Sequence, residues 1–149
     1  MRFKQQRKLK LLRRIFKQLD ESIVVVEGKR DAKALREAGV RKALILLASG
    51  SAEKVANRIA NLTTNLSANN VAKKNVAKKA ARTVRTRVVL LTDFDVEGKR
   101  RCAELEEALL AEGISANASL RHAFKRLFRV NHVEQLGFAL ERLLEETSG

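Results

Sequence analysis

The sequence contains no tyrosine, no tryptophan and only one cysteine, Cys102. The lack of tyrosine excludes a tyrosine nucleophile, and it leaves phenylalanine as the aromatic residue on which a nucleic-acid base can stack. A single cysteine excludes both an internal disulfide bond and a cysteine-based zinc site. We expect Cys102 on the apolar face of a helix, as part of the core.

Long apolar segments are also lacking. The sequence has no run of about 18 apolar residues, so we expect no segment that spans a bilayer. The basic N-terminus is not followed by an apolar stretch with a small-residue cleavage site, so we expect no secretory signal peptide. These absences favour a cytoplasmic protein without a membrane partner.

Acidic residues are scarce relative to basic ones. The 149 residues include 31 Lys and Arg but 17 Asp and Glu, a formal net charge of +14, and no acid lies between Glu53 and Asp93. Such a charge points to a polyanionic partner, most commonly nucleic acid, with an acidic membrane surface as the alternative. The hydrophobic share of 45% fits one globular domain with a substantial core.

Residues 1–21 are predicted to form a basic N-terminal helix ahead of the main domain, residues 22–149. Apolar residues recur at helical spacing from Leu9 to Leu19, while residues 1–19 hold eight Lys or Arg and no acid. Two readings are open for this helix. It either packs on the core with a solvated basic face, or it serves as an arm that contacts phosphates.

Strands are predicted from apolar, β-branched runs at 23–26, 43–47 and 88–91, with a weaker run at 114–118. Helical patterns lie between and after these runs. This alternation predicts an α/β fold with a mostly parallel, four-stranded, Rossmann-like sheet, flanked by helices and joined by right-handed crossovers. We expect residues 120–149 to form C-terminal helices.

Residues 63–86 interrupt the alternation. They begin polar and Asn-rich and continue into a Lys- and Ala-rich stretch in which Val-Ala-Lys-Lys occurs twice. We interpret this segment as a basic insert that is loosely helical or disordered alone and becomes ordered on a polyanion.

Two of the predicted strands end in acidic residues. Glu27 directly follows the first strand, and Asp93, Asp95 and Glu97 follow the strand at 88–91. The carboxyl ends of parallel strands form one edge of a sheet, where ligands bind in open α/β folds, so we expect these acids at one site. Carboxylates this close repel each other, and a hard divalent cation, which prefers oxygen ligands, would offset the repulsion.

The two acidic strand ends resemble the paired motifs of the Toprim domain. The first runs Val-Val-Glu-Gly-Lys-Arg-Asp over 25–31, and the second runs Leu-Thr-Asp-Phe-Asp-Val-Glu-Gly over 91–98. Toprim domains are the catalytic modules of topoisomerases, bacterial-type primases, overcoming-lysogenisation nucleases, recombination mediators and a ribonuclease that matures ribosomal RNA. The resemblance covers about residues 22–119 apart from the insert, and the chain is most similar to small stand-alone Toprim proteins of archaea and bacteria.

The resemblance implies a role for each acid. Glu27 would act as the general acid or base. Asp93 and Asp95 would hold Mg²⁺, with Mn²⁺ as the alternative ion, and Glu97 matches a third acid of the topoisomerase form of the motif. Asp31 also matches a motif position, but we expect it to cap the first helix of the domain.

Two positions depart from the family pattern. Phe94 replaces a frequent proline, and Lys99 stands where an acid often follows the glycine, so that it either contacts a phosphate or weakens metal binding. His122 and His132 lack the partner spacing of a metal site, and we expect them to be surface or capping residues.

Basic residues beside the motifs and in the insert are expected to contact a nucleic-acid backbone without reading its sequence. They are Lys29, Arg30, Lys73, Lys74, Lys78, Lys79, Arg82, Arg85, Lys99 and Arg100.

Two readings of the function are open. In the first, the protein is a Mg²⁺-dependent nuclease that hydrolyses phosphodiester bonds in structured RNA during ribosomal RNA processing. In the second, it is a non-catalytic Toprim-fold RNA-binding protein associated with the ribosome. The lack of tyrosine excludes covalent topoisomerase chemistry. The expected partner is ribosomal RNA or a ribosomal particle, and no small-molecule substrate is expected.

Overall fold

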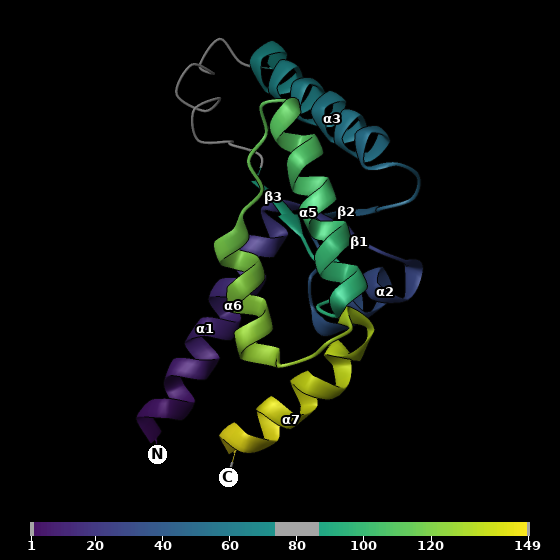
Figure 1. Ribbon diagram of the computed structural model, residues 1–149. Coiled ribbons are helices and arrows are strands. Elements are labelled where there is room, and N and C mark those ends of the chain that lie inside the picture. Colours follow the sequence, from purple (N-terminus) through teal and green to yellow (C-terminus); the bar gives the residue numbers. More distant parts are fainter. Residues whose placement is uncertain (1, 74–86, 149) are drawn as a thin grey trace.

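The computed structural model describes residues 2–73 and 87–148, with side chains described within 2–64 and 87–147. A parallel three-stranded sheet lies at its centre in the order β2-β1-β3 (Figure 1). The strands are β1, Ser22–Val26; β2, Leu44–Leu47; and β3, Arg87–Leu90. The α/β fold with a parallel, Rossmann-like sheet is therefore confirmed.

Helices cover both faces of this sheet. Their bounds are α1, Arg2–Asp20; α2, Lys29–Ala38; α3, Ala52–Lys73; α5, Val96–Ala111; α6, Ala118–Phe128; the 3₁₀ helix η1, Val133–Gln135; and α7, Leu136–Ser148. Helices α3 and α5 pack on one face, and α1, α2, α6 and α7 share the core on the other. Within the described ranges, no helix is both long and apolar enough to cross a membrane.

The central strand β1 supplies both cores. Val24 and Val26 belong to the larger core, beneath α1, α2, α6 and α7, whereas Ile23 and Val25 belong to the core beneath α3 and α5. This alternation follows from the two-residue period of a strand. Because both faces are covered, every residue of β1 is buried, which explains the continuous apolar, β-branched run at 23–26.

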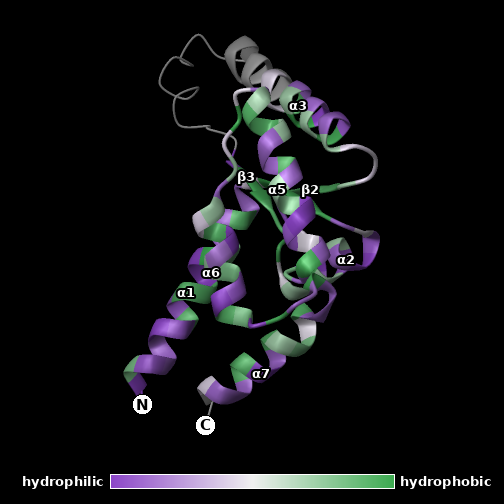
Figure 2. Cartoon of the chain, in the orientation of Figure 1, coloured by the Kyte–Doolittle hydropathy of each residue, from purple (hydrophilic) through white to green (hydrophobic). Residues whose placement is uncertain are grey.

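Helix α1 is amphipathic, as its sequence predicts. Leu12, Ile15 and Leu19 are buried in the larger core, and Phe16 stacks on Phe128 of α6 with ring centroids 6.1 Å apart. Most of its basic side chains are exposed, and the hydrophilic residues form the outer face of the helix (Figure 2). The helix therefore packs on the same core as the sheet and presents cations to solvent.

The sheet has three described strands, not the four expected. Segment 114–118 forms a single parallel bridge, between Val88 and Ala116. The side chain of Asn117 accepts a hydrogen bond from the Leu120 N–H at 3.0 Å and starts α6. The segment therefore turns into a helix before a ladder can form.

Part of the expected insert belongs to α3. This helix continues through Lys73, so residues 63–73 extend it. Residues 74–86 lie outside the described residues.

Candidate metal centre

The turn between β3 and α5 carries the acidic motif. The Asp95 carboxylate accepts a hydrogen bond from the Gly98 N–H at 2.7 Å and caps α5, so the helix begins at Val96. The buried hydroxyl of Thr92 donates to the Gly98 carbonyl oxygen at 2.8 Å. A Cβ atom at position 98 would lie 1.9 Å from the carbonyl oxygen of Asp93, so only glycine allows this close packing.

Loop 129–133 docks on the acidic turn. The Phe94 N–H donates a hydrogen bond to the carbonyl oxygen of Asn131 at 2.7 Å. The Val133 N–H, at the start of η1, donates to Asp93 Oδ1 at 3.0 Å. These two bonds fasten a segment from near the C-terminus to the carboxyl end of β3.

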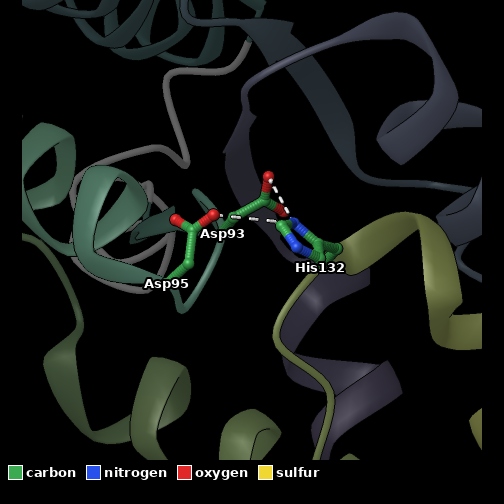
Figure 3. A group of neighbouring side chains, drawn as sticks. All are labelled: Asp93, Asp95 and His132. Carbon is green, nitrogen blue, oxygen red and sulfur yellow. Dashed lines mark ion pairs between the residues drawn. The ribbon is translucent and has the colours of Figure 1, made fainter.

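The docked loop places His132 against both aspartates. Its Nδ1 lies 3.3 Å from Asp93 Oδ2 and 3.8 Å from Asp95 Oδ2 (Figure 3). The hydrogen bond with Asp93 and the charges of the two aspartates raise the pKa of His132 above its ordinary value. The side chains of Asp93, Asp95 and His132 are 15%, 40% and 41% exposed, so solvent reaches the group.

Two further carboxyl groups, those of Glu27 and Asp31, lie near Asp93. Glu27, which directly follows β1, is largely exposed, but partial desolvation, followed by the hydrogen bond with Asp93 and its charge, raises its pKa. Burial and then the charge of Asp93 also raise the pKa of Asp31. The Asp31 carboxylate accepts the Gly28 N–H at 3.1 Å, which confirms its expected role as a cap of α2. The raised pKa values of Glu27 and Asp31 therefore partly reflect repulsion by a concentrated negative charge.

A buried arginine lies beneath the same turn. The Arg121 guanidinium of α6 donates to the carbonyl oxygens of Leu90, Thr92 and Asp93 at 2.9, 2.7 and 3.2 Å. Its Cζ lies 4.5 Å from the centroid of the Phe94 ring, within cation–π range. Burial lowers the pKa of Arg121, whereas the charges of nearby acids, Glu27 and Asp93 among them, raise it. The arginine thus fixes the backbone of the turn and supplies positive charge under the acids.

The sequence contains a signal for the burial of Arg121 that our sequence analysis did not use. Arg121 precedes Phe124 and Phe128 by three and seven residues, so it lies on the apolar stripe of α6. Arg126, by contrast, is exposed on the same helix.

His132 has no comparable signal. The sequence predicts a surface or capping residue without metal-site spacing, but the fold brings His132 from a distant part of the chain to Asp93 and Asp95, where the three side chains could hold a metal ion. Only the docking of loop 129–133 creates this proximity, and no local spacing encodes it. His122 is exposed on α6, in agreement with the expected surface position.

Glu97 lies apart from the aspartate–histidine group. It is exposed on the first turn of α5 and forms an ion pair with Arg100 at 2.8 Å. It lines a pocket of about 280 Å³ that includes Glu27, Ala48 and Arg101. Glu27 and Glu97 therefore face a shared hollow, while Asp93 and Asp95 are grouped with His132.

Four of the expected nucleic-acid contacts flank the acids. Lys29 and Arg30 are exposed on the first turn of α2, and Lys99 and Arg100 are exposed on the first turns of α5. The remaining expected contacts are Lys73, whose side chain is not described, and Lys74, Lys78, Lys79, Arg82 and Arg85, which lie outside the described residues.

The donor set of Asp93, Asp95 and His132 fits a divalent cation. One ligand atom from each side chain lies within 4.8 Å of the others. Carboxylate oxygens suit hard cations, and an imidazole nitrogen adds a donor that first-row transition ions accept.

Comparisons with known proteins bear on the family and the fold. The family model described as Toprim domain matches residues 21–118. UPF0292 protein MJ1624 of Methanocaldococcus jannaschii is 28% identical over 103 residues, which are 69% of this chain and 64% of that relative. A solved structure of a protein from Aquifex aeolicus matches 83% of this chain and 96% of its own, with a TM-score of 0.56 and 22% identity, and supports the fold alone. From the family match over both acidic motifs, the chain belongs to the Toprim domain family.

Proposed function

We propose that this protein is a divalent-metal-dependent nuclease that hydrolyses phosphodiester bonds in structured RNA. Toprim domains bind divalent metals through acidic residues, and membership of the family points to a nucleic-acid-related function. The observation that carries the proposal is the convergence of Glu27 with Asp93 and Asp95 at the carboxyl edge of the sheet. A set of acids at this edge, in a chain of net charge +14, suits a metal-assisted reaction on a polyanion.

Asp93 and Asp95 are the proposed metal-binding residues, with Mg²⁺ or Mn²⁺ as the ion. When bound, the cation would neutralise charge on the scissile phosphate and hold it in place. Gly98 and Arg121 support the arrangement, because their contacts with the backbone of Asp93 fix the position from which its carboxylate projects. Asp95 is held in turn by the Gly98 N–H.

Glu27 is the proposed general base or acid. It is beside Asp93 yet outside the group formed by Asp93, Asp95 and His132. Partial desolvation and the neighbouring Asp93 raise its pKa, which brings a carboxyl group closer to the range in which it exchanges protons near neutral pH. Its role would be to take the proton of the attacking water or to protonate the leaving oxygen.

The exposed cations around the acids are the proposed contacts to the RNA backbone. Lys29, Arg30 and Lys99 flank the candidate centre, and the basic outer face of α1 extends the positive surface. Such contacts hold phosphates without reading bases. The proposed preference for RNA, and for ribosomal RNA in particular, rests on the resemblance to the Toprim ribonuclease that matures ribosomal RNA. We propose a cytoplasmic location on the same ground.

A non-catalytic RNA-binding protein associated with the ribosome is the second candidate. One observation favours it: Glu97, the acid expected to complete the site, is paired with Arg100 instead. In this reading the Toprim fold is a scaffold for the basic surface.

Cleavage assays separate the two candidates. Wild type would be incubated with Mg²⁺, Mn²⁺ or a chelator and with a ribosomal RNA precursor, single-stranded RNA, and DNA of matched sequence. We expect metal-dependent cleavage of the structured RNA, slower by about 100-fold or more in Glu27→Gln. Glu37→Gln, an exposed acid on α2 paired with Lys33, is the matched control and should cleave as wild type does.

Two other outcomes would contradict part of the proposal. Tight RNA binding without cleavage under either ion would favour the non-catalytic candidate. Cleavage of DNA alone would keep the nuclease and overturn the RNA substrate.

A further inference from the structure

The imidazole of His132 stands at the separation expected between two ligands of one cation. Ligand atoms bound at about 2.1 Å lie about 3.0 Å apart at right angles and about 3.4 Å apart in a tetrahedron. The Nδ1 atom of His132 lies 3.3 Å from Asp93 Oδ2 and 3.8 Å from Asp95 Oδ2. All three ligand atoms lie within 4.8 Å of one another, so they approach the spacing of ligands of one ion.

The backbone holds His132 in this position from both sides. Its neighbours are tied to the acidic turn, since the Asn131 carbonyl oxygen accepts the Phe94 N–H at 2.7 Å and the Val133 N–H donates to Asp93 Oδ1 at 3.0 Å. Lys125 adds bonds from its Nζ to the Val130 carbonyl oxygen at 3.1 Å and to Asn131 Oδ1 at 3.0 Å. The loop is thus preorganised around the acids, as a metal ligand requires.

Other nearby acids are less well placed to be the third ligand. Glu97 is paired with Arg100, and Asp31 accepts the Gly28 N–H. Within the part of the chain that the structure describes, Asp93, Asp95 and His132 are the His, Cys, Asp or Glu side chains whose donor atoms converge in a group of three.

Imidazole changes which ion the centre prefers. Mg²⁺ takes oxygen ligands almost entirely, and it gives up its waters reluctantly. First-row transition ions accept imidazole nitrogen readily, and Mn²⁺ also suits carboxylates. A site with two carboxylates and one imidazole therefore favours Mn²⁺ relative to a site made of carboxylates alone.

We propose that His132 is a direct ligand of the metal held by Asp93 and Asp95, and that it makes this centre select Mn²⁺ over Mg²⁺. The inference rests on the proposed function only for the location of the metal. It does not depend on whether the protein cleaves RNA, and it is tested by metal binding and spectroscopy.

Pulsed electron paramagnetic resonance of the full chain loaded with Mn²⁺ tests the nitrogen ligand. The sequence holds two histidines, so His122→Gln, exposed on α6, is a matched control for His132→Gln. We expect ¹⁴N coupling to Mn²⁺ in wild type and in His122→Gln, and its loss in His132→Gln. Circular dichroism and thermal unfolding would verify that both variants are folded.

Calorimetric titrations with Mn²⁺ and Mg²⁺ test the selectivity. In His132→Gln, Mn²⁺ affinity should fall by about 10-fold or more, and by more than Mg²⁺ affinity does. Mn²⁺ that binds wild type without ¹⁴N coupling, or an unchanged ratio of the two affinities, would overturn the inference. If wild type binds Mn²⁺ without ¹⁴N coupling and Asp93→Asn does not bind it, the inference about His132 fails but the metal site of the proposed function survives. If wild type binds neither ion, both proposals fail.

Discussion

Gly98 and Asp93 are in direct backbone contact: a Cβ atom built on Gly98 would lie 1.9 Å from the carbonyl oxygen of Asp93 and 2.8 Å from its Cα. This contact couples the first turn of α5 to a candidate metal ligand. It explains why the acidic motif ends in glycine, because any side chain at position 98 would displace the turn that carries Asp93 and Asp95. The geometry of the acids is thus set by the packing of a helix on a strand end.

Gly98→Ala should lower the free energy of unfolding by about 2 kcal/mol or more, because the added methyl group overlaps backbone that cannot yield cheaply. Gly137→Ala is the matched control. Its Cβ would meet nothing within 4 Å in α7, so it should raise the free energy of unfolding by roughly 0.5–1 kcal/mol. Urea denaturation measures both, and equal effects of the two changes would contradict the proposed close contact.

Arg121→Met should lower the free energy of unfolding by about 3 kcal/mol, because it leaves the carbonyl groups of Leu90, Thr92 and Asp93 without their buried donor. Arg126→Met, an exposed position on the same helix, should have little effect. Chemical denaturation of the metal-free proteins gives the comparison. Similar small losses in both variants would show that Arg121 does not support the turn.

Asp93→Asn should lower the pKa values of Glu27 and Asp31 toward their ordinary values, because the charge of Asp93 helps to raise both. The asparagine carbonyl can still accept the Val133 N–H, so the loop should remain docked. Carbon-detected NMR titration of the side-chain carboxyl groups measures the shift. Glu97→Gln is the control and should leave both pKa values unchanged. An unchanged Glu27 pKa in Asp93→Asn would show that the Asp93 charge does not raise it.

The metal-free protein should lose stability as the pH rises through the pKa of His132. Its hydrogen bond with Asp93 and the charges of Asp93, Asp95 and Glu134 raise this pKa above the ordinary value of 6.5. The folded protein therefore holds the proton more tightly than the unfolded chain. The resulting stabilisation is fully present below pH 6.5 and disappears above the folded-state pKa.

Denaturation of wild type and His132→Gln between about pH 6 and 8 tests this linkage. The difference between the two proteins isolates His132 from Glu27 and Asp31, whose ordinary pKa values of 4.5 and 3.8 are lower. We expect the stability advantage of wild type to shrink as the pH rises. Parallel pH profiles would mean that the ion pair contributes nothing.

Features set by local sequence were predictable. The β-branched run at 23–26 gave the central strand, Gly39 ends α2 in a left-handed conformation with φ of 119°, and the hydroxyl of Ser51 accepts the Lys54 N–H at 3.2 Å as an N-cap. Each depends on neighbours within a few residues. The convergence of Glu27 and Asp93 could also be predicted, because parallel strands bring their carboxyl ends to one edge of the sheet.

Features set by the docking of distant segments could not be predicted from the sequence. The bridge between Val88 and Ala116 stays a single pair because Asn117 starts a helix, and that competition depends on tertiary packing. His132 reaches the acids only through hydrogen bonds of loop 129–133 to a distant turn. For Arg121, the position on the apolar stripe of α6 could be predicted from the sequence, but its carbonyl hydrogen-bond partners could not.

In the proposed function, Asp93 holds a metal that supports cleavage of RNA. The most direct measurement compares RNA cleavage by wild type and Asp93→Asn at saturating Mg²⁺ or Mn²⁺, with RNA affinity measured on the same preparations. We expect Asp93→Asn to abolish cleavage while RNA affinity is unchanged or higher, because a negative charge is removed from the surface that faces the phosphates. Equal metal-dependent cleavage by the two proteins would contradict it.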